Sequence, residues 1–242
     1  LCFVTFFLRR KATIFATDWC FTEEQSATQE NPNAKSAVWM IFVPRIYDLL
    51  FVIKSAVIEL IDKIQKIDDK VLDKIKTINR PILNKIMIVI TSLGTFGTVW
   101  FAIAIIMMIT KTYRSVGVNL VIGLAITHLL GEFTLKRIVC RSRPCHKLDD
   151  EELIIDRPKY YSFPSGHTAA SFCVVGVVFL RCQPIIWVPI LILALLIGFS
   201  RLYLRVHFLT DVLAGALLGF ICGCASVGIM VNLVINYGWV RF

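Results

Sequence analysis

The chain has 242 residues, of which 57% are hydrophobic, and a formal net charge of +9 at pH 7. Its mean hydropathy of +0.72 is far above what a soluble domain needs to fill one core, so the composition indicates a protein of the bilayer. The excess of basic residues does not indicate a nucleic-acid-binding protein, because basic and aromatic residues do not interleave on a polar surface.

Residues 1–39 differ from the rest of the chain. They open with LCFVTFFLRRK, where the basic cluster follows a short apolar run, the reverse of a secretory signal peptide. The later stretch TEEQSATQENPNAKS is polar and lacks the residues of a packed core, which predicts disorder. Because the first methionine is Met40, we interpret residues 1–39 either as a disordered extension or as the result of a start assigned too early.

Residues 40–80 are expected to form a membrane-embedded or interfacial helical segment. The stretch 38–60 is long enough to cross a bilayer but contains Arg45, Asp48 and Lys54, so a further span and an interfacial helix are equal alternatives. From residue 58 the apolar residues follow a helical spacing, with Lys, Asp and Glu on the other face. This pattern predicts an amphipathic helix on the membrane surface, with the apolar residues Ile58, Ile61, Ile64, Ile67, Val71, Ile75 and Ile78.

Five long apolar runs follow, and each is close to the roughly 20 residues that a spanning helix needs. In the first four runs the acidic and histidine side chains are only His128, Glu132 and His167, and there is no Lys or Arg. The runs cover residues 86–110, 115–135, 162–180, 182–200 and 212–240. The expected fold is therefore all-α, an integral membrane helical bundle with five or six transmembrane helices and an N-terminal amphipathic helix.

The links between these runs divide into two kinds. Residues 111–115 (KTYRS) and 181–184 are short and positively charged, which favours the cytoplasmic side of the membrane. The long loop 137–163 and the short turn 205–210 then lie on the outer face. The unusual polar residues of the chain gather on that one face, so we expect a functional site there.

Three clusters on this face carry the candidate phosphate-binding residues: KRIVCRSRP at 136–144, PSGH at 164–167, and SRLYLRVHFLTD at 200–211. Lys136, Arg143 and Arg201 supply positive charge for phosphate oxygens. Ser165 adds a hydroxyl, and Gly166 adds a backbone N–H that a ligand can approach closely at the start of a helix. Lys136 and Arg143 lie nearly on one side if their helix persists.

The same clusters supply candidates for acid–base and nucleophilic work. His207 and Asp211 are four residues apart, a spacing that places both on one face of a helix. We therefore assign His207 as a nucleophile oriented by Asp211, and His167 as the general acid that protonates the leaving oxygen. Taken singly, a basic residue at a span end is usually an anchor and a lone histidine is usually structural. Their convergence on one face favours catalysis.

A metal site is not expected. Cys140, Cys145 and His146 lie close in sequence, but they lack the second half of a zinc motif, and Arg141 and Arg143 would repel a cation.

These clusters resemble three signatures of one family. KRIVCRSRP fits the pattern KXXXXXXRP, PSGH is unaltered, and the third cluster fits SRXXXXXHXXXD. Together they are similar to the type 2 phosphatidic acid phosphatase superfamily, the lipid phosphate phosphatases, which also includes vanadium haloperoxidases. The resemblance covers roughly residues 67–235 and implies that residues 81–242 are a membrane-embedded phosphatase domain that works through a phosphohistidine and needs no metal or other cofactor.

The resemblance also implies a role for each candidate residue. The phosphate-binding residues are Lys136, Arg143, Ser165, Gly166 and Arg201. His207 is the nucleophile, His167 the acid, and Asp211 supports His207. The sequence departs from many members at Arg205 and Leu209, where a small or neutral residue and a proline are usual. We expect Arg205 either to add a cation for a diphosphate or to reach the membrane interface.

The expected partner is a lipid phosphate in the bilayer. We expect undecaprenyl pyrophosphate, because the surplus cations Arg137, Arg141 and Arg205 could meet the charge of a diphosphate. A broad phosphatase for phosphatidic acid or phosphatidylglycerol phosphate is the alternative, since the same residues could be anchors at an anionic surface. A vanadate-dependent haloperoxidase and a catalytically silent binding protein are disfavoured by the five apolar runs and by the intact His167, His207 and Asp211.

Overall fold

The structure is a computed structural model that describes residues 55–56 and 58–237. The expectations for residues 1–39, and most of those for the possible span at 38–60, lie outside these residues. From Asp68 onward the described chain belongs to one compact unit, which holds the candidate site.

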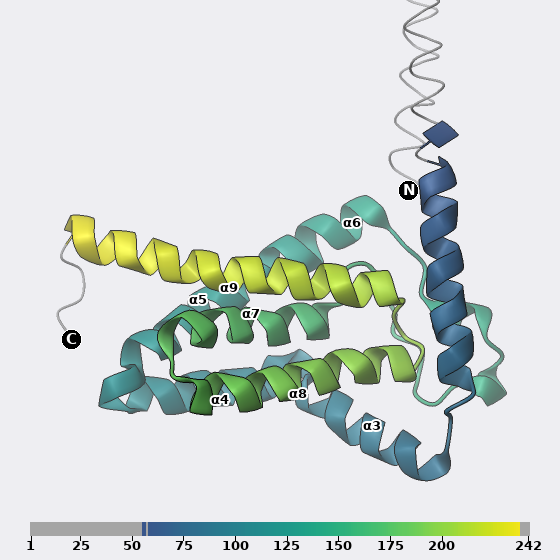
Figure 1. The fold of residues 1–242 in the computed structure, drawn as a ribbon, viewed down its shortest axis with the longest axis horizontal. Helices are drawn as coiled ribbons and strands as arrows, with labels where there is room; N and C mark the ends of the chain where they lie inside the picture. The colour runs from purple at the N-terminus through teal and green to yellow at the C-terminus, as the bar shows by residue number, and fades with distance from the viewer. Residues whose placement is uncertain (1–54, 57, 238–242) are drawn as a thin grey trace, which may run out of the picture. The chain divides into compact units, whose positions relative to one another are not determined.

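Every regular element among the described residues is helical, so the all-α prediction is confirmed. A helix over residues 58–76 comes first. The helices that follow are α3 (Pro81–Leu93), α4 (Thr98–Ile109), α5 (Arg114–His128), α6 (Lys136–Val139), α7 (Gly166–Arg181), α8 (Pro184–Tyr203) and α9 (Leu209–Tyr237) (Figure 1).

Three stretches are long and apolar enough to cross a membrane, and they are Lys111–Lys147, Pro184–Tyr203 and Leu209–Leu233. Helices α3 and α4 make a fourth candidate if they are counted together. Helix α7 has 16 residues and so extends about 24 Å, less than the roughly 30 Å of a hydrocarbon core. The fifth span therefore stays a prediction, although α7 packs inside the bundle.

The stretch 86–110 was expected to form one span, and the structure divides it into two helices. Helices α3 and α4 meet at an angle of 47°. Between them Gly97 adopts a positive φ of 68°, which glycine tolerates without steric cost. At the same break, a Cβ added to Gly94 would lie 3.0 Å from the ring of His167. The break thus lets the backbone approach the candidate acid.

A second difference concerns the helix that carries Lys136. Helix α5 continues through a π-helical stretch (Leu129–Leu135) into α6, and the helix ends at Cys140, whose backbone is left-handed with a φ of 49°. Arg143 therefore does not share a helix face with Lys136, as a continuous helix would have required. It follows in the loop instead.

The predicted amphipathic helix is present over residues 58–76. Its later apolar residues, Val71 and Ile75, pack into a hydrophobic cluster of the bundle that includes Tyr203 and Val206. Asp68, which the pattern assigns to the polar face, is fully buried. This half of the helix packs on protein, so hydrophobic spacing alone misassigned the environment of Asp68.

Helices α7 and α9 pack closely because a row of glycines on α9 faces α7. A Cβ added to Gly219 would lie 2.0 Å from the carbonyl oxygen of Ala169, closer than side-chain atoms approach in proteins. A Cβ on Gly215 would lie 2.6 Å from the carbonyl oxygen of Ser165. Small residues spaced four apart let helix backbones touch inside a membrane. The row therefore fixes the start of α7 beside the first turns of α9.

Gly219→Ala is expected to force α7 and α9 apart and to destabilise the protein in detergent by about 1–3 kcal/mol, as at other overpacked sites. Gly228→Ala is the matched control, because Gly228 lies on the same helix and an added Cβ there meets nothing within 4 Å. Titration with SDS, followed by circular dichroism, measures both variants. Equal unfolding midpoints for the two would show that the close approach is not required.

Candidate active site

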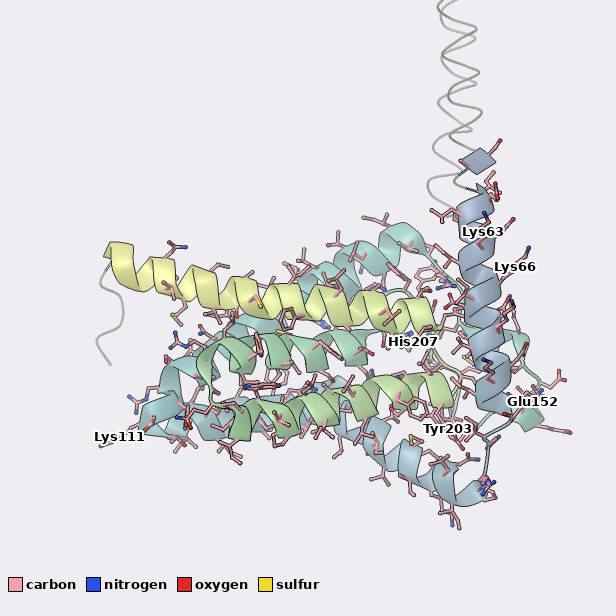
Figure 2. All side chains as sticks on the ribbon, viewed as in Figure 1. Lys63, Lys66, Lys111, Glu152, Tyr203 and His207 are labelled. Carbon is pink, nitrogen blue, oxygen red and sulfur yellow. The ribbon has the colours of Figure 1, made fainter. Side chains whose placement is uncertain are left out.

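The eight predicted site residues lie together at one end of the bundle. Figure 2 shows His207 at this end and Lys111, in the link before α5, at the opposite end. Six of the eight are buried, and these are Lys136, Arg143, Ser165, Arg201, His207 and Asp211. All of them except Ser165 can carry a charge. Charged groups are kept in such surroundings only where other groups or a ligand compensate them.

The three cations approach the site from three different elements. Arg143, in the loop after α6, donates from Nε to the Tyr160 carbonyl at 2.6 Å and from Nη1 to the Val206 carbonyl at 3.0 Å. Arg201, in the last turn of α8, donates from Nη1 to Thr91 Oγ1 at 2.6 Å.

Lys136 begins α6 and donates to Glu132 Oε1, four residues earlier in the chain, at 2.5 Å. The Lys136 ammonium also lies within electrostatic range of Arg143 and Arg201. Three like charges held so close repel one another, and an anion between them relieves that repulsion.

The PSGH cluster forms the start of α7. Ser165 precedes the helix, and its N–H donates to the Asp211 carbonyl at 3.0 Å. Its hydroxyl lies 2.9 Å from Thr168 Oγ1. The helix begins at Gly166, where an added Cβ would lie 2.5 Å from Glu132 Oε1 and 3.9 Å from Lys136 Nζ. The positive end of the α7 dipole therefore points at the same region as Lys136.

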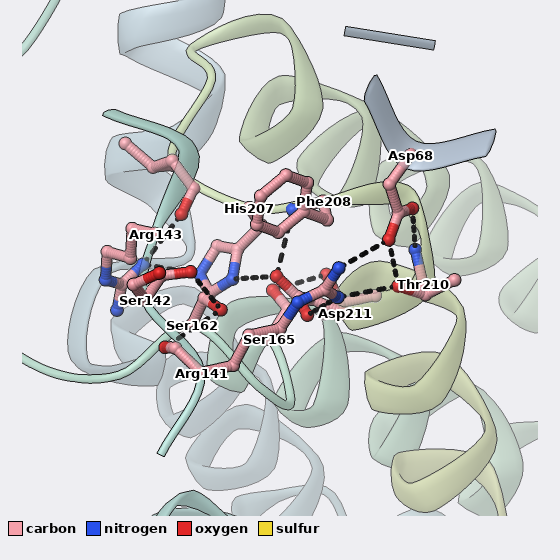
Figure 3. A network of polar contacts seen from close by, with 12 residues as sticks. Asp68, Arg141, Ser142, Arg143, Ser162, Ser165, His207, Phe208, Thr210 and Asp211 are labelled. Atoms are coloured by element: carbon pink, nitrogen blue, oxygen red, sulfur yellow. Dashed lines mark hydrogen bonds and ion pairs between the residues drawn. The ribbon is translucent and has the colours of Figure 1, made fainter. Parts of the chain in front are cut away.

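His207 and Asp211 lie side by side, but not on one helix face as predicted. His207 precedes α9, which begins at Leu209, and Asp211 lies in the first turn. Asp211 Oδ2 accepts from the Phe208 N–H at 2.9 Å, the reciprocal half of a capping box. The same oxygen lies 3.7 Å from His207 Nδ1, longer than a hydrogen bond (Figure 3). Contacts of this kind often tighten only when substrate binds.

The surroundings of His207 fix its protonation. Burial, and then the positive charges of Arg143 and Arg201, hold the pKa of His207 well below the ordinary value of 6.5, so its ring is neutral. Arg143 Nη1 lies 2.9 Å from Nε2 of the ring. Because a guanidinium can only donate, Nε2 must be the acceptor and Nδ1 must carry the proton that faces Asp211. The lone pair thus resides on Nε2.

Two buried nitrogen atoms beside this ring lack a hydrogen-bond partner within the described part of the chain, Arg201 Nε and His167 Nε2. A buried donor without a partner costs about 1–3 kcal/mol, so such atoms are expected to be satisfied by a ligand. His167 lies within electrostatic range of Arg201, His207, Lys136 and Arg143. The orphaned atoms and the cations therefore converge on one place.

The sequence did not predict the contacts that several other residues make at this end of the bundle. Thr91 on α3 holds Arg201, although nothing in its apolar run distinguishes it. Asp68 and Arg141 form ion pairs next to the site. Arg205 is buried and donates to the carbonyl of Glu152, with its Nη1 3.8 Å from the Glu152 carboxylate. Arg205 therefore pairs with the loop that carries Glu152.

The described residues contain no group of three His, Cys, Asp or Glu side chains that could hold a metal ion. The metal-free mechanism remains a prediction, because this count says nothing about a metal delivered with a substrate.

Three curated proteins are similar to parts of this chain. An undecaprenyl-diphosphatase of Sulfolobus acidocaldarius is 34% identical over 121 residues, 50% of this chain and 58% of the relative. The bacitracin transport permease protein BcrC of Bacillus licheniformis is 32% identical over 46% of this chain and 53% of its own. Phosphatidylglycerophosphatase B of Bacillus subtilis is 39% identical over 71 residues, 25% of this chain and 35% of the relative. The chain thus spans about half the length of the first of these relatives.

Two crystal structures are similar over most of their length. Aquifex aeolicus LpxE superposes with a TM-score of 0.60 at 30% identity, covering 67% of this chain and 95% of LpxE. A transmembrane PAP2-type phosphatidylglycerolphosphate phosphatase from Bacillus subtilis superposes with a TM-score of 0.61 at 28% identity, covering 78% and 96%. Residues 112–235, which include all eight site residues and more than half of the chain, match the family model described as the PAP2 superfamily. The chain therefore belongs to the PAP2 superfamily.

Proposed function

We propose that this protein is an integral membrane lipid phosphatase that works through a phosphohistidine on His207. The observation that carries the proposal is the convergence of Lys136, Arg143 and Arg201 on two histidines, beside the orphaned atoms Arg201 Nε and His167 Nε2. Fixed cations and N–H donors are what the oxygens of a transferring phosphoryl group need. Membership of the PAP2 superfamily supports the same chemistry.

In the first step, His207 Nε2 attacks phosphorus while the bond from phosphorus to the leaving oxygen breaks. The orientation of its lone pair, with Nδ1–H toward Asp211, supports this role. His167 gives its proton to the leaving oxygen, so the lipid product departs neutral at that oxygen. Lys136, Arg143 and Arg201, with the Ser165 hydroxyl and the Gly166 N–H at the start of α7, are assigned to the phosphate oxygens.

In the second step, water attacks the phosphohistidine and its proton passes to His167, which the first step left unprotonated. Phosphate leaves and His207 is restored. No metal or other cofactor enters either step, because the three cations stabilise the charge that a metal would otherwise meet.

His207→Asn and Asp211→Asn are expected to lower kcat by at least about 10²-fold, since one removes the nucleophile and the other its orientation. His167→Asn is expected to lose far less with p-nitrophenyl phosphate than with a lipid monoester, because nitrophenolate leaves without a proton. Phosphate release by purified protein in the presence of EDTA measures all three. Wild-type turnover by a folded His207→Asn variant would exclude the phosphohistidine.

We assign the site end of the bundle to the outer face of the cell membrane. The opposite end carries Lys111, Arg114 and Arg181, and Arg181 donates to Ser115 at 2.9 Å, so the two positive links lie together. Short cytoplasmic links are rich in Lys and Arg, which supports this orientation, although the loop 137–163 at the site end also carries six Lys and Arg residues.

Thiol labelling of intact cells tests the orientation. Thr112→Cys and Asp149→Cys place single thiols at exposed positions of the two ends, in a cysteine-free variant that keeps its phosphatase activity. A membrane-impermeant reagent is expected to label position 149 at once and position 112 only after permeabilisation. The reverse pattern would place the site in the cytoplasm.

We further propose undecaprenyl pyrophosphate as the substrate. The name and the 34% identity of the Sulfolobus relative support it. The charge argument from the sequence is weaker than expected, because Arg141 and Arg205 form ion pairs with carboxylates. Phosphatidylglycerol phosphate is the second candidate, supported by the phosphatases from Bacillus subtilis that resemble this chain.

The two candidates are separated by kcat/KM for undecaprenyl pyrophosphate, phosphatidylglycerol phosphate and phosphatidic acid in one detergent. A preference for the diphosphate of at least about tenfold, roughly 1.4 kcal/mol, is expected. Arg205→Ala is the control variant, and its substrate ratio is expected to equal that of the wild type because Arg205 is held by Glu152. A higher kcat/KM for either monoester would exclude the diphosphate as the preferred substrate.

A further inference from the structure

Arg141 bridges two carboxylates that are both fully buried. Its Nη1 lies 2.7 Å from Asp211 Oδ1, and its Nη2 lies 2.7 Å from Asp68 Oδ2 (Figure 3). A planar guanidinium can hold two acceptors at a fixed angle, which an ammonium cannot do. The guanidinium also stacks over the ring of Phe208, with its Cζ 4.0 Å from the ring centroid. The orientation of the guanidinium is therefore fixed by the two carboxylates at its edges and by the Phe208 ring on one face.

Asp68 fixes the far side of this arrangement. Its carboxylate accepts from the Thr210 N–H at 3.0 Å and from Thr210 Oγ1 at 2.5 Å. The first N–H groups of a helix have no partner within the helix, so Asp68 caps α9 from another element. Arg141 Nη1 donates to the same threonine hydroxyl at 2.7 Å. Asp68, Arg141 and the first turn of α9 thus form one connected unit.

This unit ends at the carboxylate that faces the proposed nucleophile. Asp211 Oδ1 is held by Arg141, and Oδ2 is held by the Phe208 N–H. The remaining side of Oδ2 faces His207 Nδ1. Rotation of this carboxylate would break at least one of the two bonds. Without the cation, a buried carboxylate would also lack its charge partner, which is costly.

We propose that Arg141, held by Asp68, is a positioning residue that aims the Asp211 carboxylate at His207. The role rests on the proposed phosphohistidine mechanism and extends it beyond the eight residues of the three signatures. Because both terminal nitrogens of Arg141 hold carboxylates, its effect falls on the orientation of His207 and not on the grip on phosphate.

Arg141→Gln is expected to lower kcat about 10- to 100-fold, by analogy with the loss seen when groups that orient metal-bound imidazoles are removed. KM should change by less than about twofold, since the phosphate-binding cations remain. Arg114→Gln is the matched control, because Arg114 is an exposed arginine at the opposite end of the bundle. It removes the same charge and is expected to leave kcat unchanged.

Inhibition by inorganic vanadate separates positioning from damage to the fold. A vanadate adduct resembling the transition state needs an axial bond from His207 Nε2, so a misoriented ring weakens it. The inhibition constant for vanadate is expected to rise about tenfold in Arg141→Gln, while that for phosphate stays constant. Partial unfolding would instead lower the number of active molecules and leave both constants unchanged.

Asp68→Asn extends the test to the other end of the unit. It keeps the shape and an acceptor for Thr210 but removes the charge that holds Arg141, so the same changes are expected at smaller size. Arg141→Lys keeps a charge that can reach only one carboxylate, and an intermediate kcat is expected. If Arg141→Gln does not fold, these two variants decide the question.

An active wild type whose Arg141 and Asp68 variants keep both kcat and vanadate inhibition would overturn the positioning role and leave the phosphatase assignment intact. A folded wild type that releases no phosphate from any lipid phosphate would overturn both.

Discussion

The organisation of the site end depends on the cost of burying positive charge in an apolar bundle. Lys136, Arg143 and Arg201 are each less than a tenth exposed, and one partly exposed carboxylate, Glu132, pairs with one of them. Arg143 and Arg201 are held by carbonyl and hydroxyl oxygens, which orient a guanidinium without neutralising it. The protein therefore keeps a surplus of fixed positive charge that a phosphate can balance. Its donors are oriented before any ligand arrives, which is the arrangement that electrostatic catalysis requires.

The helices around this surplus of positive charge are held in place by close backbone contacts. The glycine row on α9 brings the backbone of α7 into contact, and the Ser165 N–H donates to the Asp211 carbonyl at the end of that contact. The start of α7 and the first turn of α9 are thus joined by backbone packing and by a hydrogen bond. This contact consequently fixes the start of α7, with its dipole and the candidate acid His167, relative to His207.

Much of this could be read from the sequence, and the reasons for the rest are physical. The apolar runs predicted an all-helical membrane protein because backbone groups in a bilayer must be paired within a helix. The three motifs selected eight candidate residues, which the structure brings together at one end of the bundle, because their chemistry is unusual in such surroundings. Spacing failed where the chain leaves regular geometry, at the end of α6 and at His207 before α9. It also failed for Asp68, since helical periodicity cannot tell a polar face in water from one packed on protein.

Asp68 lies outside the region that matches the family model, although it contacts residues next to the candidate site. The family match covers residues 112–235, whereas Asp68 and Thr91, which contact Arg141 and Arg201, both precede it. A fragment trimmed to the matched region would retain every signature residue and still lose Thr91, which holds Arg201, and Asp68, which holds Arg141. A comparison confined to the motifs would rate such a fragment as intact. For this protein, the hydrogen bond and the ion pair that hold these two arginines extend beyond the limits of the alignment.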